Sequence, residues 1–265
     1  MAYLTCDLFS EVLQVGTSIS VILPQTVEDQ IGVAGTGVDG PPPVLYLLHG
    51  LTDDQTAWHR YTSVGRYAEA AGLAVVMPAV HHSFYADEVH GHRYWAYVSD
   101  ELPSLVQSFF RVSDRPSETF VAGLSMGGYG ALKLALTHPE RYAAAASLSG
   151  ALDIRYLIGH EERAALFRRV FDDTIGDSDD LFALLEAAPS PPPLYVGCGT
   201  GDGLFEANQR FVAAVTRKGA ELTTDFRPGD HEWGLWDAMI ADVIDWLPIG
   251  RECAEPPGID GATPR

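Results

Sequence analysis

The chain alternates short, wholly apolar runs with segments of helical periodicity over most of its length. The apolar runs are residues 44–48, 73–77, 119–122, 143–148, 194–196 and, less regularly, 221–226. The helical segments are residues 61–71, 101–110, 126–136, 205–218 and 235–246. Strands that are apolar throughout and alternate with helices are typical of a parallel sheet covered on both faces. The pattern therefore predicts an α/β fold with a mostly parallel central sheet flanked by helices.

Several segments break this alternation. Residues 8–23 alternate apolar and polar positions around Gly16-Thr17-Ser18, which predicts an antiparallel hairpin. Residues 26–43 are rich in Gly and Pro and are expected to form a surface loop. Residues 153–188 mix short amphipathic pieces with acidic residues and are too long for a simple connection. We therefore predict a small cap or lid inserted at about residues 152–190.

The domain organisation follows from length and composition. A chain of 265 residues with 46% hydrophobic and 20% charged residues can bury the core of one large domain. We expect a single domain over residues 1–248 and a disordered, Pro- and Gly-rich tail over residues 249–265.

The charge balance is strongly acidic. The formal net charge is −19, and Lys133 and Lys218 are the only lysines. Such a surface repels phosphate backbones and anionic lipid, so we expect no nucleic-acid partner and no membrane partner. A surface adapted to high salt could have this composition, and so could compositional drift, which is the simpler interpretation.

Targeting and redox signals are weak. No apolar run approaches the roughly 18–20 residues of a membrane span. The first residues lack a basic stretch followed by an apolar one, so we expect no signal peptide and a cytoplasmic location. Cys6, Cys198 and Cys253 are odd in number and widely spaced, which matches neither a disulfide framework nor a metal site.

The most informative motif lies at residues 119–130. An apolar strand runs directly into Gly123-Leu124-Ser125-Met126-Gly127, and a helical pattern follows. This strand–turn–helix context is the one a G-x-S-x-G nucleophile elbow requires, whereas a tight turn with a serine N-cap is the alternative. The helix N-terminus would favour negative charge developing beside Ser125. We therefore predict that Ser125 is a nucleophile.

The rest of a hydrolytic site can be placed by chain order. The early strand 44–48 ends in His49-Gly50-Leu51, so the backbone N–H groups of Leu51 and Met126 are the predicted oxyanion-hole donors. Each such donor typically contributes about 10²–10³ in rate.

An acid and then a histidine should follow the serine in the chain. His231, in the loop after the last strand, is the predicted base, because His138 ends a helix and His160 lies in the predicted cap. Asp202, after strand 194–196, is the predicted acid that orients His231, and Asp230 is too close to His231 in sequence to orient it.

Four stretches together resemble one family. They are residues 46–50 (Tyr-Leu-Leu-His-Gly), 123–136, 147–150 (Ser-Leu-Ser-Gly) and 231–233 (His-Glu-Trp). They resemble the putative-esterase family, in particular its bacterial tributyrin esterases, over about residues 5–248. Related branches are esterase D, which is an S-formylglutathione hydrolase, and the secreted mycolyltransferases. The resemblance implies an α/β-hydrolase fold, short-chain esterase activity without a cofactor, and the triad Ser125, Asp202 and His231.

The sequence also departs from that family. The loop at residues 26–43 is long, and residues 81–92 are rich in histidine. With Asp87 and Glu88 nearby, these histidines could bind zinc, but a surface or pocket loop is the simpler interpretation and we predict no metal site. The predicted substrate contacts are Gly50, Tyr85, Tyr94, Trp95 and Trp233.

The predicted function is a serine carboxylesterase that hydrolyses short-chain acyl esters through an acyl-enzyme intermediate. Its partner is a small-molecule ester, and a homo-oligomer is left open. The first alternative is an S-formylglutathione hydrolase, whose elbow usually has histidines at the two positions where Leu124 and Tyr129 stand here. An acyltransferase or a non-catalytic metal-binding protein is the remaining alternative.

Overall fold

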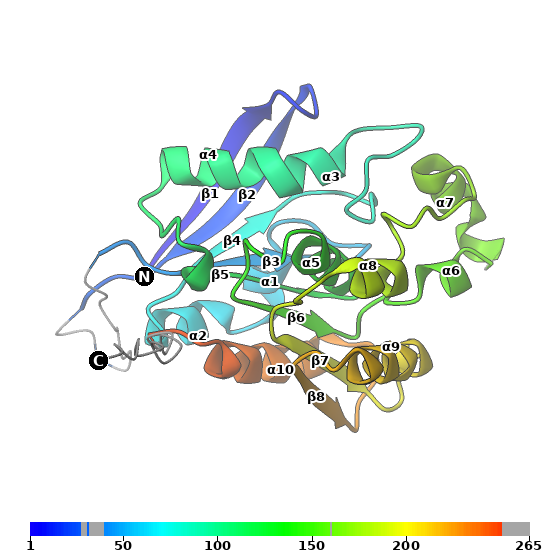
Figure 1. The fold of residues 1–265 in the computed structure, drawn as a ribbon. Helices are drawn as coiled ribbons and strands as arrows, with labels where there is room; N and C mark the ends of the chain where they lie inside the picture. The colour runs from blue at the N-terminus through cyan, green and yellow to red at the C-terminus, as the bar shows by residue number, and fades with distance from the viewer. Residues whose placement is uncertain (28–30, 32–39, 160, 251–265) are drawn as a thin grey trace, which may run out of the picture.

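The computed structural model describes residues 1–27, 31, 40–159 and 161–250. Most of the predicted tail, and with it Cys253, therefore lies outside the described residues, as do His160 and much of the loop at 26–43. In the described part, an α/β architecture is confirmed, with a central sheet between two layers of helices (Figure 1).

The sheet has eight strands in the order β1-β2-β4-β3-β5-β6-β7-β8. From β4 to β8 all neighbours are parallel, and β2 pairs antiparallel with both β1 and β4. The strands are β1 Ala2–Ser10, β2 Val15–Leu23, β3 Val44–Leu48, β4 Ala74–Pro78, β5 Thr119–Leu124, β6 Ala144–Leu148, β7 Leu194–Gly199 and β8 Leu222–Arg227. The predicted mostly parallel sheet is thus confirmed, with a hairpin at one edge.

The hairpin turns earlier than the pattern around Gly16-Thr17-Ser18 suggested. Its strands pair from Ala2 opposite Leu23 to Ser10 opposite Val15, so the turn lies at residues 11–14. A carboxylate far along the chain holds this turn, because Glu101 accepts hydrogen bonds from the backbone N–H groups of residues 11 and 12 and from the Ser10 hydroxyl. A contact over 90 residues of chain leaves no local signal in the sequence.

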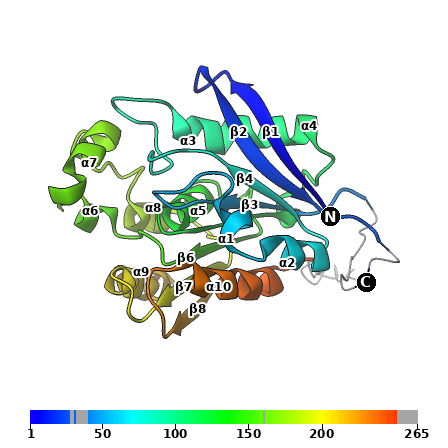
Figure 2. The ribbon, with the colours of Figure 1, turned by 180° about the vertical axis from the view of Figure 1, so that it is seen from behind.

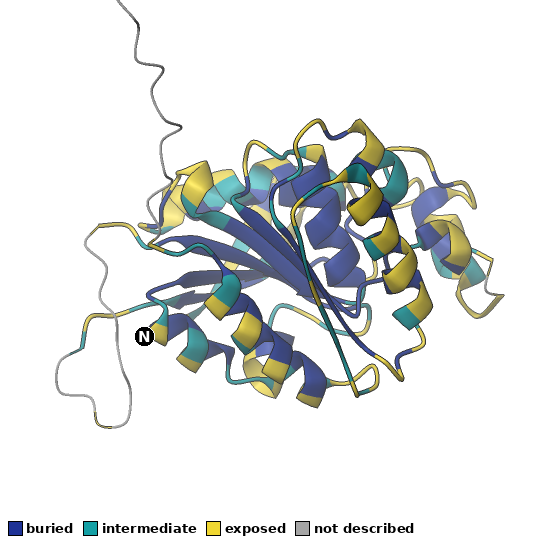
Figure 3. Cartoon of the chain, turned by 60° about the horizontal axis from the view of Figure 1, so that its bottom comes forward, coloured by how far each residue is buried: buried dark blue, intermediate teal, exposed yellow. Residues whose placement is uncertain are grey.

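Helices on the two faces bury alternate side chains of the same strands. Leu45 and Leu47 pack against α1 (Ala57–Tyr61), α2 (Val64–Ala70) and α10 (Trp233–Trp246). Tyr46 and Leu48 pack on the opposite face, where α4 (Leu102–Phe109), α5 (Met126–Thr137), α8 (Leu181–Ala187) and α9 (Phe205–Lys218) lie. Seen from behind, α1, α2 and α10 lie in front of the sheet (Figure 2). Burial on both faces explains why these strands are apolar at every position (Figure 3).

The helix predicted at residues 61–71 corresponds to α2, which starts at Val64, whereas α1, which ends at Tyr61, was not predicted. The two helices are separated by side-chain contacts, since the Thr62 hydroxyl donates to Trp58 O and the N–H of Ser63 donates to Asp237 of α10 at 2.8 Å.

The other predicted helices agree more closely. The prediction for α10 was two residues short at its start, and α5 and α9 agree within one residue. The helix predicted at 101–110 contains α4, but the helical path begins earlier, with α3 (Tyr94–Ala96) and a π-helical turn at Tyr97–Glu101.

The segment between β6 and β7 has two parts. Helices α6 (Ile154–Leu157) and α7 (Ala164–Phe171) lie together beyond the body of the sheet, whereas α8 packs beside α5 in the flanking layer (Figure 1). The aromatic side chains of α7, Phe167 and Phe171, contact Phe84 with ring centroids 5.3 and 6.3 Å apart. The predicted insertion at 152–190 therefore contains one helix that belongs to the main architecture.

A buried ammonium group joins this segment to α5. Lys133 is 4% exposed, and its Nζ lies 2.6 Å from Asp179 Oδ1, 3.2 Å from Tyr85 O and 4.3 Å from the centre of the Trp95 ring. The hydroxyl of Tyr129, one turn earlier in α5, donates to Asp179 O at 2.7 Å. These contacts satisfy the ammonium group, so the loop before α8 and the segment at 85–95 are both held against α5.

We expect Lys133→Met to lower the free energy of unfolding by about 2–4 kcal/mol, because Asp179 would lose its partner at a site that water reaches poorly. Urea denaturation measures this change. The double variant Lys133→Met, Asp179→Asn should recover at least half of the loss, since no charge is then left unpaired. A double variant as unstable as the single one would contradict this account.

Candidate active site

Ser125 stands at the sharp turn between β5 and α5. Its φ is 53° and its ψ is −117°, a backbone conformation that residues other than glycine rarely adopt. The turn is held at both sides by backbone hydrogen bonds, from Ser125 N–H to Leu148 O at 2.9 Å and from Ala151 N–H to Ser125 O at 3.0 Å. The strained backbone therefore fixes the position of the serine at the carboxyl ends of β5 and β6.

The glycines around Ser125 are required by close backbone contacts. A Cβ on Gly123 would collide with the backbone of Gly127, and a Cβ on Gly127 would collide with the backbone of Leu48 and His49. A Cβ on Gly128 would collide with the Ser147 hydroxyl. The first turn of α5 thus lies directly against the end of β3, which brings the loop after β3 next to the nucleophile.

The predicted acid and base form a hydrogen-bonded pair. His231 Nδ1 lies 2.8 Å from Asp202 Oδ2, and the carboxylate side chain is 1% exposed, whereas the imidazole is 38% exposed. Among the described residues the imidazole makes its hydrogen bond through Nδ1 alone, so Nε2 is available to a substrate or to a serine hydroxyl. This arrangement fixes the tautomer of His231 with its proton on Nδ1.

Further groups stabilise the Asp202 carboxylate. The backbone N–H of Leu204 donates to Oδ1 at 2.8 Å, and the Ser149 hydroxyl lies near the carboxylate. Burial raises the pKa of Asp202, but the hydrogen bonds from His231 and Leu204, the charge of His231 and the Ser149 hydroxyl outweigh it, so the pKa lies below its usual value. Asp202 is therefore an anion at neutral pH.

Ser149 and Trp236 are part of this network and were missed by the sequence analysis. Trp236 Nε1 donates to Ser149 Oγ at 3.1 Å, and its ring meets the His231 ring edge-to-face with centroids 4.8 Å apart. Ser149 has a positive φ of 47°, so the chain leaves the regular path of β6 at this residue. Since its hydroxyl accepts from Trp236, its single proton is free for the neighbouring Asp202 carboxylate or the Cys198 sulfur.

We expect Ser149→Ala to lower kcat about tenfold with little change in KM, because Asp202 and Trp236 each lose a buried partner. Steady-state kinetics on a chromogenic ester measures this. Ser147→Ala is a matched control, since the Ser147 hydroxyl is buried and has no hydrogen-bond partner in the described part of the chain. Equal losses in both variants would assign the effect to packing.

The loop after β3 is held by its carbonyl groups. The Trp58 indole donates to Leu48 O at 3.0 Å, the Tyr85 hydroxyl donates to His49 O at 3.0 Å, and His49 Nδ1 lies 2.7 Å from Gly50 O. The His49 ring is fixed in turn by the N–H of Val80, which donates to Nε2 at 3.1 Å. His49 is therefore neutral, with its proton on Nδ1.

This arrangement orients the predicted oxyanion donors. The peptide bond is planar and trans, so the N–H of Leu51 points away from the Gly50 carbonyl that His49 holds. Among the described residues no hydrogen bond uses the Leu51 N–H. The N–H of Met126 belongs to the first turn of α5, where the helix itself supplies no acceptor. Both amides are thus available beside Ser125.

Burial disfavours the charged form of His49 and lowers its pKa to about 4. The ring is therefore neutral in the folded protein at neutral pH. The unfolded state binds a proton near pH 6.5, so the free energy of unfolding should fall as pH drops from 6.5 to about 4, by about 3 kcal/mol from this group. Urea titrations across this range measure the slope. His49→Gln should be flatter there, and an equally steep slope would contradict the assignment.

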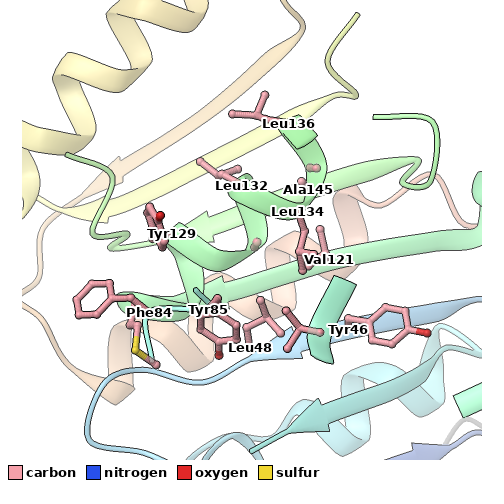
Figure 4. Close-up of a cluster of buried hydrophobic side chains, with 14 of the residues drawn as sticks. Tyr46, Leu48, Phe84, Tyr85, Val121, Tyr129, Leu132, Leu134, Leu136 and Ala145 are labelled. Atoms are coloured by element: carbon pink, nitrogen blue, oxygen red, sulfur yellow. The ribbon is translucent and has the colours of Figure 1, made fainter. Parts of the chain in front are cut away.

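The predicted substrate contacts fall into two groups. Gly50 lies beside the nucleophile, since a Cβ there would be 3.7 Å from Ser125 Cβ, and Trp233 contacts Trp236 with ring centroids 5.3 Å apart. Tyr85 is fully buried below the oxyanion loop, among the core side chains with Leu48 and Tyr129 (Figure 4). The Tyr85 hydroxyl donates to His49 O, so this side chain supports the loop after β3.

Tyr94 and Trp95 lie in packed surroundings. Tyr94 is 5% exposed, with His81 and His92 at its edges. Trp95 stacks on His138 at the end of α5, more than three helical turns after Ser125, and lines a separate pocket together with Lys133 and Asp179. Their contact with substrate stays a prediction.

The histidine-rich segment does not assemble a metal site among the described residues. No group of three or more His, Cys, Asp or Glu side chains there could hold an ion. His90 faces Asp172 at 3.4 Å, His92 Nδ1 lies 3.1 Å from Leu13 O, and Glu88 pairs with Arg169 at 3.0 Å. The side chains of this segment thus have separate partners.

The strand order, the strained serine after β5 and the paired Asp and His at the ends of later strands define an α/β-hydrolase. Residues 10–247 match the family described as Putative esterase. The chain belongs to this family of carboxylic ester hydrolases, which confirms the resemblance inferred from its motifs. No helix within the described residues is both long and apolar enough to cross a membrane.

Comparison with known proteins finds similar chains among esterases and other serine hydrolases. An acetyl esterase of Caldicellulosiruptor saccharolyticus is 29% identical over 262 residues, covering 93% of this chain and 98% of its own. Among solved structures, the fluorophosphonate-binding serine hydrolase FphF of Staphylococcus aureus has a TM-score of 0.83, and the S-formylglutathione hydrolase FrmB of the same organism has 0.81. Each is 34% identical to this chain and covers 93% of it, with 98% of its own length aligned.

Proposed function

We propose that the chain is a serine carboxylesterase that hydrolyses short-chain acyl esters. Two observations carry the proposal: the Asp202–His231 hydrogen bond of 2.8 Å and the strained elbow conformation of Ser125. The similarity to an acetyl esterase supports a small acyl group. The triad acts without a cofactor in this proposal.

The reaction begins at Ser125. His231 Nε2 accepts the hydroxyl proton while Oγ attacks the ester carbonyl, and Asp202 stabilises the imidazolium that forms. The amides of Leu51 and Met126 donate to the oxyanion of the tetrahedral intermediate. His231 then protonates the leaving alcohol, and an acyl-enzyme remains on Ser125. Water, deprotonated by His231, releases the acid by the same route.

An S-formylglutathione hydrolase is the second candidate. The similarity to FrmB favours it, because that chain is 34% identical over nearly its full length. The same serine, histidine and oxyanion hole would cleave a thioester with a thiolate as the leaving group. The two candidates therefore differ in the leaving group and share the machinery.

Hydrolysis of 4-nitrophenyl acetate, butyrate and octanoate and of S-formylglutathione tests the proposal. We expect the wild type to prefer the short oxygen esters, and Ser125→Ala to lose at least about 10⁴-fold in kcat because the acyl-enzyme cannot form. Mass spectrometry after treatment with a fluorophosphonate should find the adduct on Ser125.

The Ser147→Ala variant is again a matched control and should keep its activity and its labelling at Ser125. Activity that survives in Ser125→Ala would overturn the nucleophile. A strong preference for S-formylglutathione would replace the first candidate by the second.

A further inference from the structure

One more ionisable side chain lies within reach of the nucleophile, on the oxyanion loop itself. A Cβ on Gly50 would be 3.0 Å from Asp53 Oδ2 and 3.7 Å from Ser125 Cβ. These two atoms are therefore no more than about 7 Å apart. Asp53 is half-buried and interacts electrostatically with His231. A carboxylate thus stands next to the place where the reacting carbonyl must bind.

The position of this carboxylate is fixed. The N–H of Asp53 donates to Gly50 O at 3.3 Å, which closes a tight turn before α1. The N–H of Gly50 lies close enough to the Asp53 carboxyl to favour its ionised form. The carboxylate therefore belongs to the same turn that presents the Leu51 N–H.

The charge of Asp53 is not neutralised by an ion pair within the described residues. Arg60, the nearby cation, makes its ion pair with Asp54 at 3.5 Å, and both of these side chains are about half exposed. Burial raises the pKa of Asp53, while Gly50 N–H, Arg60 and His231 oppose that effect and Asp54 adds to it. Asp230 and Glu232 on either side of His231 add negative charge, and the whole chain has a formal net charge of −19.

We propose that Asp53 is a specificity-determining residue that selects esters without negative charge in their acyl or alcohol part. A substrate carboxylate that binds about 7 Å from Asp53, in a site partly open to water, is disfavoured by roughly three- to tenfold. Neutral esters do not meet this repulsion. This inference rests on the proposed esterase function and refines its substrate class.

The inference also separates the two candidate functions. Glutathione carries two carboxylates and one ammonium group, so its thioesters have a net negative charge at neutral pH. An acetyl or butyryl ester of an uncharged alcohol has none. The charge at Asp53 therefore favours neutral oxygen esters over glutathione thioesters, although both could be cleaved by Ser125.

Two substrate pairs test this selection. The first is 4-nitrophenyl hexanoate against mono-4-nitrophenyl adipate, which share leaving group and chain length and differ in one carboxylate on the acyl side. The second is methyl 4-acetoxybenzoate against 4-acetoxybenzoate, which differ on the alcohol side. The ratio of kcat/KM for the neutral and the anionic member is measured at pH 8 and low ionic strength, where carboxyl groups are ionised.

Asp53→Asn is the informative variant, because asparagine keeps the size and the acceptor oxygen of the side chain while the charge is removed. We expect its neutral-to-anionic ratio to fall three- to tenfold in at least one pair, and 1 M NaCl to lower the wild-type ratio in the same pair. Asp114→Asn is the matched control. It makes the same change in net charge at an exposed position by the start of β5, the opposite end of the sheet from Ser125.

The outcomes are distinct. Ratios for Asp53→Asn that equal those of the wild type and Asp114→Asn would overturn the selection by charge. A variant that loses activity equally on both members of each pair would assign Asp53 to loop geometry alone and would also overturn it. A wild type that cleaves neither neutral ester would instead refute the proposed esterase function, because the neutral members require only the triad and the oxyanion hole.

Discussion

The close approach of the first turn of α5 to the end of β3 is the contact on which the rest of the site depends. Gly127 has no Cβ, and its backbone lies where any side chain would collide with Leu48 and His49. This contact requires the elbow at Ser125, with its strained φ and ψ, and it brings the loop after β3 beside the nucleophile. The free energy that offsets the strain comes from the packing of β5 and α5 in the core, where nearly every residue of α5 is buried.

A second constraint is the fixation of backbone carbonyls in the loop after β3. The side chains of Trp58, Tyr85 and His49 hold the carbonyl groups of residues 48–50. Each of these side chains is buried and hydrogen-bonded, so moving any of them would leave a polar atom unsatisfied. In the proposed mechanism, the amide donors of this loop are thereby oriented before substrate binds, which is the requirement for electrostatic stabilisation.

The buried network also explains why aromatic residues are so common near the site. Trp236 combines an edge-to-face contact with His231 and a hydrogen bond to Ser149, so its ring shields the imidazole while its N–H serves the acid. Tyr85 supports the oxyanion loop and packs against Gly130 of α5. Lys133 links α5 to the segments on either side of it. The nucleophile helix is thus held along its length by polar contacts within an apolar core.

The sequence by itself determined the α/β class, most of the strand and helix pattern and the sharp turn at Ser125, because alternating apolar runs and a G-x-S-x-G turn are local signals. It also placed Asp202 and His231 at the ends of later strands, where the parallel sheet must bring them to one edge.

Only the tertiary structure decided where each aromatic side chain of residues 85–95 lies. The Tyr85 hydroxyl bonds to His49 O, whereas Trp95 stacks on His138 at the far end of α5. The local sequence around these two residues does not distinguish their surroundings. Other features depend on contacts between distant segments or on backbone angles. They are the hairpin turn held by Glu101, the Ser149 hydroxyl near Asp202, and the Asp53 carboxylate near Ser125. Hydrophobic periodicity records burial, whereas the direction of a polar side chain is set by the fold around it.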